Sequence, residues 1–183
     1  MKMISIAALT LCTVLFLSDC ASDPRKAKAT QIFSEINEIA QKPVEKEPMM
    51  NAMVRLNEAK KNFPAERDKI FADVQLGKEF CNKAIEYNTQ LIDKYEELLS
   101  LGIDNPSADC VQSSLKVQHA LIEQMRLSIS EFDILLDEDI TDKATLDSKS
   151  LPIRESAKLA AKSYEDLNAE QRSLCSKSSL NIK

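Results

Sequence analysis

The chain has 183 residues, a formal net charge of −5 and a pI near 5.1. This acidic balance argues against nucleic acid as a partner and against strong adhesion to anionic lipid, because both reward clustered Lys and Arg. The chain contains only two glycines and no tryptophan. Its many Ala, Leu, Ile, Glu, Lys and Gln residues therefore favour an all-α fold.

Residues 1–22 are predicted to be an export signal. Lys2 precedes the apolar run Met3–Leu17, and small or polar residues follow at 18–22. The apolar run is about 15 residues long, whereas a helix that spans a bilayer needs about 20. We therefore expect cleavage and a location outside the cytoplasm. An uncleaved membrane anchor is the less favoured alternative.

The end of this signal offers two cleavage sites. Residues 17–20, Leu-Ser-Asp-Cys, resemble a bacterial lipobox, in which a peptidase cuts before a cysteine that carries lipid. Asp19 departs from that pattern, since the family has a small residue before the cysteine. The resemblance implies a lipid anchor on Cys20 in the periplasm, and Ala21 is compatible with the outer membrane. The alternative is ordinary cleavage after Ser22, without lipid.

The rest of the chain is predicted to be one antiparallel helical bundle. We expect a polar tether over 23–28, a single domain over 29–178 and a frayed terminus over 179–183. Apolar residues at helical spacing predict five helices over about 27–41, 48–62, 64–101, 106–140 and from about 151 onward. Short connections predict that the last three run up, down and up, and an acidic turn is expected over 137–150.

The long third helix carries a heptad seam typical of bundles and coiled coils. Cys81, Asn88 and Tyr95 recur along it every seven residues, and Gln118 is the polar residue in the apolar stripe of the next helix. Buried amides of this kind fix helix register. Asn88 and Gln118 lie at core positions of their seams, and the alternative is that they face a groove or the end of the bundle.

The cysteines of the exported chain predict one disulfide, because pairs tend to close in oxidising compartments. If the last two helices turn near residue 145, Cys175 returns level with about residue 115, roughly 7 Å along the axis from Cys110. Cys81 would lie opposite about residue 125, much farther away. We predict a Cys110–Cys175 disulfide, with Cys81 buried and reduced.

Catalytic and metal-binding patterns are weak throughout. The single histidine, His119, lies beside the apolar stripe, and the scattered cysteines lack the close spacing of a zinc site. The acidic residues 137–142 lack the glycine and the terminal glutamate of a calcium-binding EF-hand loop. We therefore expect no cofactor, no metal and no enzymatic activity.

The leading functional prediction is a non-catalytic module that binds a protein partner or has a structural role at the cell envelope. Met49, Met50, Met53 and Phe63 form a candidate partner or ligand surface, because flexible thioethers suit adaptable apolar contacts. These residues could instead pack the second helix onto the bundle. The alternative function is binding of a small apolar or amphipathic ligand between the N-terminal helices and the bundle.

Overall fold

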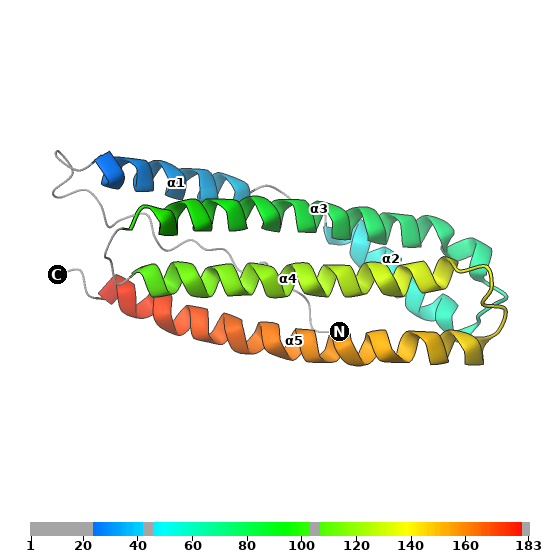
Figure 1. Cartoon of the computed structure of the whole chain (residues 1–183). Coiled ribbons are helices and arrows are strands. Elements are labelled where there is room, and N and C mark those ends of the chain that lie inside the picture. Colours follow the sequence, from blue (N-terminus) through cyan, green and yellow to red (C-terminus); the bar gives the residue numbers. More distant parts are fainter. Residues whose placement is uncertain (1–23, 42–45, 103–106, 181–183) are drawn as a thin grey trace. The chain divides into compact units, whose positions relative to one another are not determined.

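The computed structural model describes residues 24–41, 46–102 and 107–180, which form five α-helices and no strand (Figure 1). The helices are α1 (Pro24–Ala40), α2 (Lys46–Lys61), α3 (Arg67–Ser100), α4 (Ser107–Leu136) and α5 (Lys143–Leu180). The predicted all-α helical bundle is confirmed. The predicted export signal, including Cys20, lies outside the described residues, as do residues 181–183.

Helix α1 begins earlier than its apolar pattern suggests. It starts at Pro24, so residues 24–28, which were expected to form a tether, are helical. Proline suits the first position of a helix, because its φ is already helical and its missing N–H has no intrahelical partner there. At the other end of the described chain, α5 continues to Leu180.

Helix α5 also begins earlier than expected. The structure places its start at Lys143 instead of near Leu151, and Pro152 lies inside it. The carboxylate of Asp142 caps the helix by accepting bonds from the Thr145 amide at 2.9 Å and the Thr145 hydroxyl at 2.7 Å. Leu146 in the first turns is fully buried. A cap and a buried anchor thus extend the helix into the predicted turn.

The end of α3 follows the prediction. Gly102 has a φ of +57° and its amide donates to the Leu99 carbonyl at 3.1 Å. Glycine takes this left-handed conformation without the steric penalty that a Cβ brings. Gly102 therefore ends the helix as a cap.

The chain divides into two compact units. Within the described residues, unit 1 holds α1, α3 from Thr89, α4 as far as Gln118 and α5 from Asp166. Unit 2 holds α2, α3 as far as Asn88, α4 from His119 and α5 as far as Glu165. The expectation of a single domain over 29–178 stays a prediction.

The core of unit 1 lies between α1, α3 and α4. Buried side chains of this core are Ala29, Ile32, Ile36, Leu91, Tyr95, Leu98 and Val111. Ion pairs at the edge join Lys28 to Glu97 at 3.0 Å and Lys94 to Glu35 at 2.5 Å. Residue numbers rise along α1 as they fall along α3, so these two helices are antiparallel.

The core of unit 2 involves α2, α3, α4 and the start of α5. Its buried side chains include Leu56, Phe63, Val74, Cys81, Met125, Phe132, Leu135, Ile140 and Leu146. Helix α3 approaches α4 closely at Gly77, where an added Cβ would lie 2.6 Å from Cζ of Phe132. Glycine is therefore needed at this contact.

Candidate functional site

A disulfide joins the first turn of α4 to the last turns of α5 in unit 1. The sulfurs of Cys110 and Cys175 are 1.99 Å apart and their Cα atoms are 4.8 Å apart. This is the pairing predicted from the helical hairpin, and it is confirmed. The hairpin register explains why the pair closes directly: Gln171, one turn before Cys175, contacts Ser114, one turn after Cys110.

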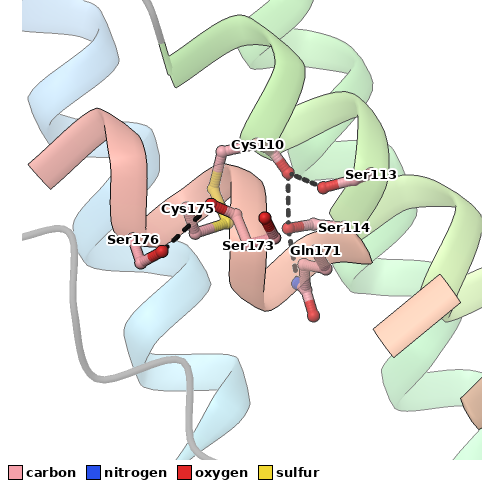
Figure 2. The surroundings of a disulfide bond; sticks show 7 residues. All are labelled: Cys110, Ser113, Ser114, Gln171, Ser173, Cys175 and Ser176. Atoms are coloured by element: carbon pink, nitrogen blue, oxygen red, sulfur yellow. Dashed lines mark hydrogen bonds between the residues drawn. A yellow bond between two sulfur atoms is a disulfide. The ribbon is translucent and has the colours of Figure 1, made fainter. Parts of the chain in front are cut away.

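A chain of buried hydrogen bonds lies next to this bridge (Figure 2). Nε2 of Gln171 donates to Oγ of Ser114 at 2.7 Å, and that hydroxyl donates to the Cys110 carbonyl at 2.9 Å. The Ser113 hydroxyl donates to the same carbonyl at 2.8 Å. The disulfide and the adjoining hydrogen bonds therefore hold α4 and α5 together at the same height along the hairpin.

The cysteines differ in exposure. Cys110 is only 2% exposed, whereas Cys175 is half-buried. Cys81 is buried in unit 2 and carries a free thiol, as predicted. Burial raises the pKa of the Cys81 thiol to about 11. Because the thiolate is the reactive form, Cys81 is chemically inert in the folded chain.

The residues predicted to form a partner surface are divided between core and surface. Phe63 is 6% exposed and belongs to the core of unit 2, which agrees with the alternative that these residues pack the second helix onto the bundle. Met53 packs against the same core. Met50 is 50% exposed and therefore does lie on the surface, and the side chain of Met49 is outside the described part of the structure. Large aromatic side chains release much free energy on burial, which accounts for the position of Phe63.

Val54 of α2 is a surface residue that no sequence pattern indicated. Val54 lies one turn after Met50 and is 63% exposed. Ala52, Leu56 and Ala59 of the same helix are buried. Met50 and Val54 thus form a short apolar strip on the outer face of α2, which we call the α2 strip.

A half-buried carboxylate is held between two cations in unit 2. Glu131 of α4 pairs with Lys60 of α2 at 2.7 Å and with Arg154 of α5 at 3.3 Å. Burial alone would raise the pKa of Glu131, but the charges of Lys60 and Arg154 outweigh it and hold that pKa below its ordinary value. Three helices are thereby joined through one side chain.

Arg67, at the start of α3, binds the turn between α4 and α5. Its guanidinium donates to the carbonyls of Asp137, Glu138 and Ile140 and lies 5.9 Å from the centre of the Phe63 ring. These residues follow the last residue of α4, Leu136, so the guanidinium supplies donors to carbonyls of the turn between α4 and α5. No sequence pattern predicted this contact, because it joins residues about seventy positions apart.

The two predicted core amides have different environments. Asn88 is half-buried and its Nδ2 donates to the Ala84 carbonyl at 2.6 Å. Gln118 is 7% exposed, and within the described structure its Oε1 has no hydrogen-bond partner. An unpaired buried carbonyl destabilises the fold, since it loses its bonds to water without replacement.

The acidic residues between α4 and α5 have structural contacts. Asp137 pairs with Lys149 at 2.9 Å and accepts the Asp139 amide at 3.0 Å, and Asp142 caps α5. Hydrogen bonds from Lys149 and from the Asp139 amide lower the pKa of Asp137. Across residues 24–41, 46–102 and 107–180, no group of three or more His, Cys, Asp or Glu side chains is arranged to hold a metal ion.

Comparison with known proteins gives no relative. No protein-family model, curated protein or solved structure matches this chain significantly. Among the helices that the structure describes, none combines the length and apolar composition needed to cross a membrane. The Cys110–Cys175 bridge and the α2 strip are therefore the features from which a function can be inferred.

Proposed function

We propose that this chain is exported and acts as a non-catalytic helical module at the cell envelope, anchored by lipid on Cys20 and bound to a protein partner. The Cys110–Cys175 bridge is the observation that carries the proposal. Disulfides persist in oxidising compartments and are rare in the reducing cytosol. The apolar run Met3–Leu17, followed by cleavable residues, supports the same destination.

The α2 strip supports a protein partner. Met50 and Val54 are separated by one helical turn, so their side chains are neighbours on one face of α2. That face points away from the buried Ala52, Leu56 and Ala59. Exposed neighbouring apolar side chains are typical of a contact surface, and a thioether adapts to the shape of the partner.

The N-terminus of the mature protein tests export and anchoring together. Intact mass measurement on protein from the native membrane fraction is expected to give a chain that begins at Cys20 and carries lipid. A chain that begins at Asp23 without lipid would keep export and reject the anchor. An unprocessed chain in the cytoplasmic fraction would overturn the proposal.

A photo-crosslinking residue at position 54 tests the partner surface. We expect one discrete crosslinked protein from position 54 in intact cells. A crosslinker at Glu155, which is exposed on α5, is the control and is expected to give no such product. The same product from both positions, or none from position 54, would reject the α2 strip as the contact surface.

A further inference from the structure

The two cysteines of the disulfide differ in their exposure to solvent. Cys110 is almost fully buried, and Val111, Ser113 and Ser114 beside it are buried as well. Cys175 is half-buried, and its neighbours Ser173 and Ser176 are exposed. A disulfide is exchanged when a thiolate attacks one of its sulfurs, so access decides which sulfur is attacked. The greater exposure of Cys175 therefore favours attack on its sulfur.

The position of Cys110 at a helix N-terminus also favours attack on Cys175, with Cys110 as the leaving thiolate. Cys110 is the fourth residue of α4. It therefore belongs to the first turn, where the backbone N–H groups have no intrahelical acceptor. The positive end of a helix dipole stabilises a thiolate and lowers its pKa. Cys175 lies five residues before the end of α5, more than one turn inside the helix, so the dipole has little effect there. Asp109 next to Cys110 is exposed, so water screens its charge.

We propose that the Cys110–Cys175 bridge is a thiol–disulfide exchange site of fixed polarity, in which Cys175 is the sulfur that external thiols modify. An external thiolate attacks Sγ of Cys175, the bond between the two protein sulfurs breaks, and Cys110 leaves as a thiolate. The product is a mixed disulfide on Cys175. A second external thiolate then displaces Cys175, so that two external thiols become one disulfide and the protein gains two thiols.

Closure follows the same path in reverse. An external low-molecular-mass disulfide is attacked by the Cys175 thiolate, which releases one external thiolate and leaves the mixed disulfide. Cys110 then attacks Sγ of Cys175 and releases the second external thiolate. The bond between Gln171 and Ser114 does not involve sulfur, so it keeps the two cysteines at the same level while the bridge is open.

Partial reduction of the folded wild-type chain with glutathione tests the proposal. After acid quenching and alkylation, trypsin separates the cysteines into peptides 79–83, 95–116 and 173–177. We expect glutathione on peptide 173–177 in at least about tenfold excess over peptide 95–116, because the attacked sulfur keeps the adduct. Equal labelling, or an excess on peptide 95–116, would overturn the proposal.

Single-cysteine variants test the closing direction. With oxidised glutathione, and at a pH where both cysteines are thiolates so that access decides the rate, Cys175 in Cys110→Ser is expected to react at least about tenfold faster than Cys110 in Cys175→Ser. Equal rates would contradict the assigned polarity. Cys81 is the internal control: it stays unmodified while the chain is folded. Glutathione on peptide 79–83 would show that a variant has unfolded, and the wild-type measurement then decides.

Discussion

Gln171 on α5 donates a hydrogen bond of 2.7 Å to the Ser114 hydroxyl on α4, one helical turn from the bridge between Cys110 and Cys175. Both partners are buried, so neither can exchange this bond for one to water. The contact fixes the register of α4 and α5 in unit 1 independently of the sulfurs. It also provides a test of how buried amides act in this chain.

Gln171 and Gln118 are a matched pair for that test. Gln171 is 6% exposed and Gln118 is 7% exposed. The side chain of Gln171 donates a hydrogen bond to Ser114, whereas Oε1 of Gln118 has no hydrogen-bond partner in the described structure. We expect Gln171→Met to lower the free energy of unfolding by about 1–2 kcal/mol. The same change at Gln118 should leave it unchanged or raise it by about 1 kcal/mol, since an unpaired buried carbonyl is removed. Urea unfolding measures both, and equal destabilisation by the two variants would contradict this account.

The disulfide is expected to contribute substantially to stability. It joins residues 65 positions apart, and closing a loop of that length contributes about 4 kcal/mol in the chain-entropy model. The double variant Cys110→Ala/Cys175→Ala should lose an amount of this order in urea unfolding. Dithiothreitol should destabilise the wild type and leave the double variant unchanged. A double variant as stable as the oxidised wild type would show that the bridge is energetically neutral.

Hairpin geometry was enough to predict this pairing, but the predicted register was several residues off. Asp137 to Ser150 looked like an acidic turn, and Pro152 looked like a helix start. The missing information was tertiary: Ile140 and Leu146 are buried in the core of unit 2, and Asp142 caps α5 through Thr145. The shorter turn brings Cys175 level with Cys110.

Gly77 is expected to resist substitution. A Cβ there would lie 2.6 Å from the ring of Phe132, which is itself buried and cannot swing into solvent. Gly77→Ala should therefore lower the free energy of unfolding by about 1–3 kcal/mol, although alanine is the better helix former. Phe132→Leu is the second arm of a double-mutant cycle. The double variant should be clearly more stable than the sum of the two single changes predicts, whereas additive effects would refute the contact.

Glu131 is expected to make stability depend on acid. Its pKa in the folded chain is held below the ordinary 4.5 by Lys60 and Arg154, against the effect of burial. A depressed folded pKa gives stability that is fully present above the unfolded pKa and is lost as the pH falls through the folded pKa. Glu131→Gln should lower the free energy of unfolding by about 1–2 kcal/mol at pH 7. That difference should shrink below about pH 4.

Glu58→Gln is the control for this measurement. Glu58 pairs with Lys61 one turn away on the surface of α2, where both side chains are well exposed. Exposed pairs contribute little, so we expect almost no change at either pH. A Glu131→Gln deficit that stays constant from pH 7 to pH 3 would show that the loss comes from packing and not from charge.

The candidate site was only partly predictable for physical reasons. Periodicity places Met53 and Phe63 on one side of a helix, but it does not say whether that side faces the core or solvent. The structure buries Phe63 and leaves Met50 outside. The α2 strip includes Val54, which is neither a methionine nor an aromatic residue and therefore belonged to no predicted surface. The contact of Arg67 with the turn between α4 and α5 had no local sequence signal at all.

The redox state of the cysteines in intact cells is the most direct test of the central claim that the chain works in an oxidising compartment with its bridge closed. Thiols are alkylated with a membrane-permeant reagent before lysis, and tryptic peptides are mapped without reduction. We predict that peptides 95–116 and 173–177 are joined through Cys110 and Cys175, and that Cys81 reacts only after denaturation. Alkylated Cys110 and Cys175 in unreduced cells would contradict the claim.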